Sequence, residues 1–208
     1  TDVSVFADPL VGLDFKLRER LIDDLRQTQE ELKVSFVYLT SDPLEALSLA
    51  RTVMILADGK IVQQDSLDVV YDLPNSIASL NSLGFPEANI VSGELSGSTF
   101  TSVLGQIKVK MDSNVSNVVA GIRPEGFEIA SGSGSFDARV SLLENLGSEF
   151  AVYLNVKNSN LVTVVSRTDN DALAKLKSKS VSLTYKADAV VLFDANTGKR
   201  VGQGVSHV

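Results

Sequence analysis

The residues that could do chemistry stand just after two short apolar runs of the chain. Asp8 and Asp14 follow the run at residues 3–6, and Ser41 follows the run at residues 35–40. A carboxylate at the end of a buried strand is a candidate ligand for a hard cation or a candidate general base. Structural roles compete with this chemistry. The two aspartates could be solvated loop or capping residues, and Ser41 could cap the next helix with its hydroxyl oxygen.

Several other kinds of site are excluded by residue type. The 208 residues contain no cysteine, so disulfides and thiolate metal sites are excluded, and the single histidine, His207, cannot build a histidine cluster. No nucleophile triad or metal cluster is evident. From the residues alone, Arg123 and Glu125 could form an ordinary surface ion pair. A short basic patch is interpreted as a solvated helix end: Lys175, Lys177 and Lys179.

The charge balance excludes one class of partner. Lys and Arg number 19 against 26 Asp and Glu, a net charge of −7, so a diffuse attraction to nucleic acid phosphates is not expected.

With 44% hydrophobic and 22% charged residues, the chain can support packed cores in one large or two small domains. No apolar run approaches the roughly 20 residues that span a bilayer, and no leader-like segment opens the chain. We therefore expect a soluble, cytosolic protein.

The first part of the chain alternates short apolar runs with amphipathic stretches up to about residue 83, which predicts a parallel sheet covered by helices. Asp14 is a predicted N-cap, and residues 42–45 form a capping-box helix start with proline at the first helical position. Asp58-Gly59 predicts a two-residue hairpin turn, because glycine accepts positive φ. The first helix carries a leucine stripe that we expect to be core: Leu17, Leu21, Leu25 and Leu32.

Beyond Phe85-Pro86 the pattern changes to strands with period-two alternation, separated by clusters of Gly, Ser, Asn and Asp. One helix is expected near residues 171–177, and residues 131–135 form a flexible loop by composition. This part therefore predicts a small β-barrel or sandwich. Predicted strands include residues 106–111, 140–143, 150–156 and 181–185.

Two stretches of the first part resemble motifs of ABC ATPases. Residues 5–14, Val-Phe-Ala-Asp-Pro-Leu-Val-Gly-Leu-Asp, resemble the Walker B strand and D-loop, usually four apolar residues followed by D-E-P-L-S-x-L-D. Residues 37–46 resemble the switch segment, usually Y-V-T-H-D-x-x-E-A, and residues 58–63 resemble the hairpin that follows it. Their order and spacing together make the resemblance specific.

The second part resembles the regulatory, OB-like (TOBE) domain of ATPases of the maltose-importer type. The motif G-I-R-P-E is specific to that subclass and is matched by Gly121, Ile122, Arg123, Pro124 and Glu125. The pattern V-E-x-L-G-x-E is matched around Glu144, Gly147 and Glu149, and L-F-D is matched at residues 192–194.

The resemblance covers nearly the whole chain and implies a fold of the α/β plus β class. It implies that residues 1–84 are the C-terminal part of an ABC nucleotide-binding domain with a parallel sheet. Residues 85–208 would then be an OB-like β-barrel regulatory domain, in which Arg123 and Glu125 help to shape a turn.

The resemblance also implies that the catalytic positions are altered. Ala7 replaces the aspartate that orients Mg²⁺ and cannot hold a cation. Asp8 replaces the glutamate that acts as general base and is one methylene shorter, and Ser41 replaces the switch histidine. Both are degenerate catalytic positions, so at most weak activity is implied. The D-loop, which in the family lies at the dimer interface and communicates with the opposite nucleotide site, is matched by Gly12, Leu13 and Asp14.

Two motifs of the family are missing from the 208 residues: no G-x-x-x-x-G-K-[ST] and no L-S-G-G-Q-like signature occurs. Without a glycine-rich nest and its lysine, β- and γ-phosphates cannot be cradled. ATP and Mg²⁺ are the cofactors of the parent family, but neither is expected to bind this chain, which is predicted to be inactive alone. In the family both motifs precede the Walker B strand, so we expect the chain to begin downstream of them.

The implied parent is the ATP-binding subunit of an ABC importer for sugars, polyols or glycerol-type solutes, peripheral on the inner face of the plasma membrane. Expected partners are another ABC ATPase in a homo- or heterodimer, permease subunits, and a regulatory protein or small ligand on the second part. Some glycerol importers pair two ATPases, one with serine for the switch histidine, and a degenerate member of such a pair is the preferred version. The alternative is a non-catalytic module for ligand sensing or protein docking.

A partial sheet would also leave apolar surface bare. If strands and helices are missing beside the first part, residues such as Val3, Val5, Phe36 and Val53 would lack part of their covering. Bare apolar surface of this kind favours self-association, so a dimer or a swapped assembly is expected.

Overall fold

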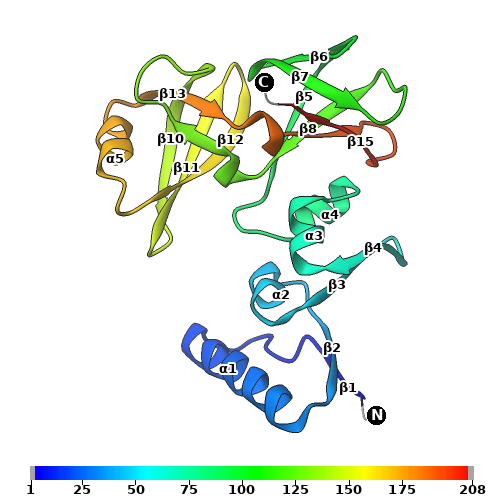
Figure 1. Cartoon of the computed structure of the whole chain (residues 1–208). Coiled ribbons are helices and arrows are strands. Elements are labelled where there is room, and N and C mark those ends of the chain that lie inside the picture. Colours follow the sequence, from blue (N-terminus) through cyan, green and yellow to red (C-terminus); the bar gives the residue numbers. More distant parts are fainter. Residues whose placement is uncertain (1–2, 206–208) are drawn as a thin grey trace.

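The computed structural model describes residues 3–205, which form a small α/β part followed by a larger β-rich part (Figure 1). The α/β part lies at one end of the molecule, the β-rich part at the other, and two short helices lie between them. This agrees with the predicted fold class. His207 lies outside the described residues. Within residues 3–205, no helix is both long and apolar enough to cross a membrane.

The first βαβ unit forms as predicted. Strands β1 (Val3–Ala7) and β2 (Ser35–Leu39) pair in parallel and are connected by helix α1 (Phe15–Leu32). The leucine stripe of α1 is nevertheless not core, because the helix has no buried residue, and Leu17 and Leu32 are 42% and 63% exposed. That prediction is wrong, since a sheet of two strands offers too little surface to bury one face of an 18-residue helix.

A hairpin and three helices follow this unit. Helix α2 (Pro43–Leu49) leads to strands β3 (Thr52–Ala57) and β4 (Lys60–Ser66), and then come helices α3 (Leu67–Asp72) and α4 (Ile77–Ser82). Asp58 and Gly59 join β3 to β4 with φ of 49° and 71°, which confirms the predicted two-residue turn.

The expected bare surface is present at some positions and not at others. Val3 and Val5 are 56% and 67% exposed, as predicted. Phe36 is half-buried, and its ring meets the Phe6 ring edge-to-face with 5.1 Å between the ring centroids. Val53 is only 8% exposed, so the prediction for this residue is wrong. Helices α3 and α4 pack onto the hairpin and cover it, in a cluster of Val53, Ile55, Val70 and Leu83.

Six strands of the β-rich part close into a barrel in the order β14-β15-β7-β6-β5-β8. The closed order leaves no free edge, because β8 pairs with both β5 and β14. The strands are β5 (Asn89–Ser96), β6 (Thr99–Ser102), β7 (Gly105–Met111), β8 (Val118–Ile122), β14 (Val191–Asp194) and β15 (Arg200–Gly204).

Beside the barrel lies an antiparallel sheet in the order β12-β11-β10-β13-β9. Its strands are β9 (Phe127–Ile129), β10 (Phe136–Asn145), β11 (Glu149–Val156), β12 (Ser159–Ser166) and β13 (Ser180–Tyr185), with helix α5 (Asn170–Leu176) before β13. Short 3-10 turns η1 (Pro124–Gly126) and η2 (Ala187–Ala189) connect sheet and barrel. One continuous core of buried residues runs through both, so they fold on each other.

A buried asparagine joins the barrel to this sheet. Asn89, at the start of β5, is 5% exposed. Its side-chain nitrogen donates to the carbonyl oxygen of Val162 at 2.8 Å, and its side-chain oxygen accepts from the Val162 N–H at 2.6 Å. Val162 lies on β12, the edge strand of the sheet, so the amide takes the place of a neighbouring strand there.

Helix α4 contacts both parts of the molecule. Its Leu80 packs with Val191 and Phe193 of the barrel, whereas Leu83, directly after the helix, belongs to the hairpin cluster. The division of the chain at residues 84 and 85 therefore stays a prediction.

Candidate functional site

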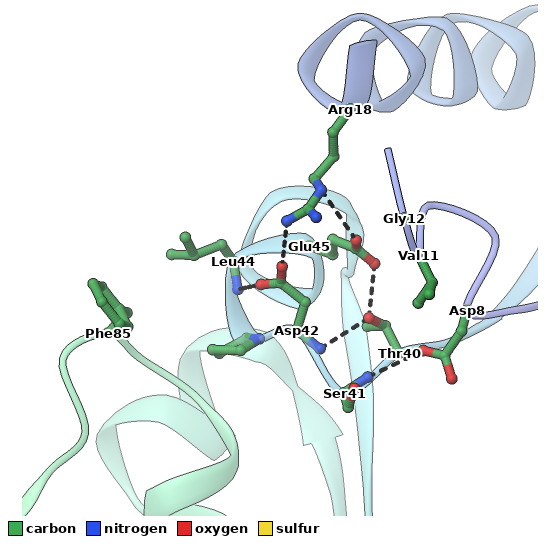
Figure 2. Close-up of a pocket in the computed structure, with 11 residues that line it drawn as sticks. Asp8, Val11, Gly12, Arg18, Thr40, Ser41, Asp42, Leu44, Glu45 and Phe85 are labelled. Atoms are coloured by element: carbon green, nitrogen blue, oxygen red, sulfur yellow. Dashed lines mark hydrogen bonds and ion pairs between the residues drawn. The ribbon is translucent and has the colours of Figure 1, made fainter. Parts of the chain in front are cut away.

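The Walker B-like and switch-like segments face one another across an open hollow of about 530 Å³ (Figure 2). The loop after β1 forms one wall, and the end of β2 and the start of α2 form another. Phe85, from the segment before the barrel, reaches the rim. The fold thus brings together Asp8, Gly12 and Ser41, three of the residues singled out from the sequence.

Asp8 sits in a strained turn immediately after β1. Its φ of 44° is in the left-handed region, and its N–H donates to the Leu39 carbonyl at 2.8 Å. One carboxylate oxygen accepts from the Ser41 N–H at 3.3 Å. Ala7, the last residue of β1, offers no side-chain oxygen beside it. Asp8 is therefore tied to the switch-like segment and supplies a single carboxylate to this end of the hollow.

Asp42, not Ser41, caps helix α2. The Leu44 N–H donates to a carboxylate oxygen of Asp42 at 2.8 Å, and Pro43 occupies the first turn. Ser41 is exposed at the rim of the hollow. The predicted capping role of Ser41 is wrong, because the aspartate that follows it is correctly placed to accept from the helix N–H groups.

A buried carboxylate lies behind this cap. Glu45 is 4% exposed and accepts from the Tyr38 hydroxyl at 2.9 Å and from the Thr40 hydroxyl at 2.7 Å. Thr40 in turn accepts from the Asp42 N–H at 3.0 Å. Glu45 thus binds Tyr38 on β2 and Thr40 directly after it, instead of reaching back to its own helix start as a capping box would require. Burial, followed by the hydrogen bond to Glu45, raises the pKa of Tyr38 well above its ordinary value.

Arg18 connects helix α1 to this group and was missed by the sequence reasoning. Its Nη1 donates to Asp42 at 2.9 Å, and its Nε lies 4.0 Å from the Glu45 carboxylate. Arg18 extends from α1 toward the start of α2 (Figure 2). Because Asp42 is 24 positions away along the chain, no local sequence pattern marks this contact.

The residues around the hollow do not fit a magnesium triphosphate. Three carboxylates line it, but Asp42 is engaged by Arg18 and the Leu44 N–H, and Glu45 by Tyr38 and Thr40. Only Asp8 is left as an oxygen donor of the kind that Mg²⁺ prefers. Within residues 3–205, no group of three or more Asp, Glu or His side chains is arranged to hold a metal ion.

Of the three D-loop-like residues, Gly12 and Asp14 are exposed and Leu13 is half-buried. Gly12 has a φ of 81°, and the half-buried Leu13 donates its N–H to the Leu10 carbonyl at 3.3 Å. Asp14 accepts from the Leu17 N–H at 3.0 Å, so its predicted role as N-cap of α1 is confirmed. The neighbouring Val11 is 73% exposed. The loop therefore presents a bare surface at the mouth of the hollow.

The G-I-R-P-E motif lies away from this hollow, where the barrel meets α3 and α4. Arg123 donates to the Tyr71 carbonyl through Nη2 at 3.0 Å and lies over the Tyr71 ring, 3.7 Å from its centroid. The Tyr71 hydroxyl donates to Glu125 at 2.6 Å. Arg123 and Glu125 therefore both contact Tyr71, and the alternative of a direct surface ion pair between them is wrong. Pro124 opens the short turn η1, and Gly121 lies on β8.

The remaining motif residues lie in the β10–β11 hairpin. Glu144 accepts from the Tyr153 hydroxyl at 3.0 Å, and Gly147 has a φ of 98° in the turn. The Glu149 carbonyl accepts from the Leu146 N–H at 2.9 Å. These contacts shape the hairpin and place none of the three beside the hollow. In the predicted basic patch, Lys175 donates to Ser131 at 3.1 Å, in keeping with a solvated helix end.

Comparison with known proteins agrees with this arrangement. The TOBE domain family matches residues 120–193, which run from β8 to β14. The xylose/arabinose import ATP-binding protein XacK of Haloferax volcanii is 31% identical over 95% of this chain and 54% of its own length. The sn-glycerol-3-phosphate import ATP-binding protein UgpC of Jannaschia sp. is 30% identical over 96% of this chain and 56% of its own length.

A third relative, UgpC of Psychromonas ingrahamii, is 27% identical over 96% of this chain and 55% of its own length. The chain thus spans about half the length of the curated relatives that it matches. Motifs, fold and relatives point the same way over nearly all of its residues. The chain belongs with the C-terminal region of the ATP-binding proteins of sugar and glycerol-3-phosphate ABC importers, including their TOBE domain.

Proposed function

We propose that this chain is the part of an importer's ATP-binding subunit that supplies subunit contact and regulation rather than nucleotide chemistry. The parent complex couples ATP hydrolysis to the import of a sugar, polyol or glycerol-type solute. It pairs two ATP-binding chains beneath permease subunits on the cytoplasmic face of the plasma membrane. The observation that carries the proposal is the similarity, over 95% of the chain, to an import ATP-binding protein.

The state of the hollow supports a role without catalysis. Ala7 and Ser41 lack the carboxylate and imidazole that the family places there, and Asp8 alone cannot bind Mg²⁺ together with a triphosphate.

The exposed surface beside the hollow supports a role in contact between subunits. Val11 and Phe15 are each 73% exposed and flank the D-loop-like residues. Apolar side chains so exposed next to a defined loop are typical of a protein interface.

Nucleotide binding to the whole chain tests the first half of the proposal. Titration calorimetry with ATP, in the presence and absence of Mg²⁺, is expected to give no saturable heat. Saturable, Mg²⁺-dependent binding that disappears in Asp8→Asn would contradict the proposal, because it would place a working metal site at this carboxylate.

Sedimentation equilibrium tests the second half, with a second copy of this chain as the partner. We expect concentration-dependent association that Val11→Asp weakens by about tenfold or more, since it places a charge in an apolar contact. Leu142→Asp is the matched control, because Leu142 is also an exposed aliphatic side chain, 55% exposed, but lies on β10 away from the hollow. Equal weakening by both substitutions, or no association at all, would count against contact through the D-loop-like surface.

The ligand-sensing alternative makes a different prediction. A thermal-shift screen of the whole chain against sugars, oxyanions and nucleotides is expected to show no ligand-specific stabilisation. A concentration-dependent rise in melting temperature with one ligand class would favour a sensing module, because a ligand that binds only the folded state stabilises it.

A further inference from the structure

The contact between the barrel and helices α3 and α4 is built on one arginine that binds free helix carbonyls. Arg123 Nη2 and Nε donate to the Tyr71 carbonyl at 3.0 and 3.3 Å, and Nη1 donates to the Leu80 carbonyl at 3.3 Å. A further bond from Nη1 goes to the Leu83 carbonyl. The last carbonyls of a helix have no partner within it, so the guanidinium satisfies the ends of two helices at once.

The surroundings hold this guanidinium in place. Gly84 has a φ of 103°, which favours glycine, and a Cβ there would lie 2.8 Å from Arg123 Nη1 and would displace the guanidinium from its present position. The Tyr71 ring covers one face of the guanidinium, and the Tyr71 hydroxyl is itself bound by Glu125. Burial raises the pKa of Tyr71 to about 12, with the Glu125 hydrogen bond the next cause.

A second contact runs alongside the first. Gly121 on β8 lies close to α4, and a Cβ there would be 2.5 Å from Cδ2 of Leu80 on that helix. The same Cβ would be 2.8 Å from Cε2 of Phe193 on β14 of the barrel. Leu80 is 2% exposed and packs among barrel residues. The first and third residues of the G-I-R-P-E motif thus both fix helix α4 to the barrel, one by close packing and one by hydrogen bonds.

From these contacts we infer that Arg123, Tyr71 and Glu125 form an intramolecular latch, by which the barrel, α3, α4 and the β3–β4 hairpin move as one rigid body. A displacement of the barrel by any ligand or partner then carries the hairpin with it. The segment at residues 84–88 links two parts of this body and does not act as a hinge. The inference goes beyond the proposed function and does not depend on it.

Hydrogen exchange on the whole chain tests the latch. Arg123→Ala is expected to speed exchange of the α3 and α4 amides by about tenfold or more, while β11 and β12 keep their protection. Arg123→Lys keeps the positive charge but loses the planar set of N–H donors, so its α3 and α4 exchange rates are expected to lie between those of the unaltered chain and those of Arg123→Ala. The matched control is Arg167→Ala: Arg167 also lies over an aromatic ring, Phe150 at 5.4 Å, but binds no helix carbonyl in the described structure.

Distances between spin labels report the rigid body directly. The chain has no cysteine, so paired cysteines at Gln64 on β4 and Thr101 on β6, both exposed, would be labelled selectively. We expect one narrow distance distribution that broadens in Arg123→Ala and is unchanged in Arg167→Ala. If Arg123→Ala fails to fold, Arg123→Lys and Tyr71→Phe carry the test. Unchanged distances and unchanged α3 and α4 exchange in the folded variants would overturn the latch.

Discussion

At the scale of single residues, the hollow is organised by a carboxylate pair and one arginine rather than by catalytic groups. Asp42 and Glu45 are oriented by Arg18, Tyr38 and Thr40, so the two acids serve the packing of α1, β2 and α2 against each other. Removing one partner of a largely buried charge leaves the other uncompensated. The stability of this part of the chain should therefore depend on Arg18.

Arg18→Ala is expected to lower the free energy of unfolding of the α/β part by about 1–3 kcal/mol, because Asp42 and the buried Glu45 lose their cation. Arg26→Ala, on the same helix, is the control. Arg26 is exposed and bonds only the Ser48 carbonyl and Asp23, so its loss should cost under about 1 kcal/mol. Hydrogen exchange of the α2 amides, recorded as a function of urea concentration, measures the free energy of unfolding of both variants. Equal losses of stability for the two variants would show that Arg18 acts as an ordinary surface residue.

Tyr71 makes stability depend on alkaline pH. Burial and the bond to Glu125 raise its pKa from 10.0 to about 12 in the folded chain. The stabilisation is fully present below pH 10 and is lost as pH rises toward about 12, because the unfolded tyrosine loses its proton first. Tyr71→Phe should show a shallower fall of the urea midpoint over that range, the other tyrosines being retained. Identical slopes for the two proteins would rule out this linkage.

At the scale of elements, the spacing of apolar residues in the sequence predicted which helices and strands form, but not which surfaces they pack against. The leucine spacing of α1 correctly indicated a helix, yet burial of that face needs a wider sheet than β1 and β2 provide. The predicted strands of the second part did form, because the alternation of apolar and polar residues along a strand is a local property of the sequence. Contacts of Arg123 with Tyr71 and of Asn89 with Val162 join residues 52 and 73 positions apart, which no local pattern encodes.

The edge of strand β12 gives a prediction at this scale. Asn89→Ala leaves both the N–H and the carbonyl of Val162 buried without a partner, so the free energy of unfolding should fall by about 2–4 kcal/mol. Asn160→Ala is the control, since Asn160 lies exposed on the same strand and meets only Asn155. Chemical denaturation compares them, and a loss for Asn89→Ala no larger than for Asn160→Ala would mean that water replaces the amide.

At the scale of the whole molecule, burial is distributed unevenly. Helix α1 has no buried residue, whereas the barrel and the five-stranded sheet share one core. Regions with few buried contacts open at a lower free-energy cost than the rest of a protein. The family resemblance predicted the two parts and the TOBE domain, but it could not reveal this difference, which follows from how much surface each part buries.

We expect native-state hydrogen exchange in low urea to show α1 and β1 opening well before β11 and β12. The measurement belongs at several protein concentrations, because Val3 and Val5 are exposed and association would protect them. Protection of α1 that grows with concentration would support self-association through this bare sheet. A single transition at every concentration, with α1 as protected as β11, would contradict the uneven distribution.

The latch at Arg123 also bears on how such proteins diverge. The arginine recognises main-chain oxygens of Tyr71, Leu80 and Leu83, which every amino acid carries. Outward-facing positions of α3 and α4 can therefore mutate without loosening the attachment, whereas Gly84 and Gly121 are constrained by the space they leave. Homologues should drift in the composition of these two helices while retaining the same orientation of helix pair to barrel.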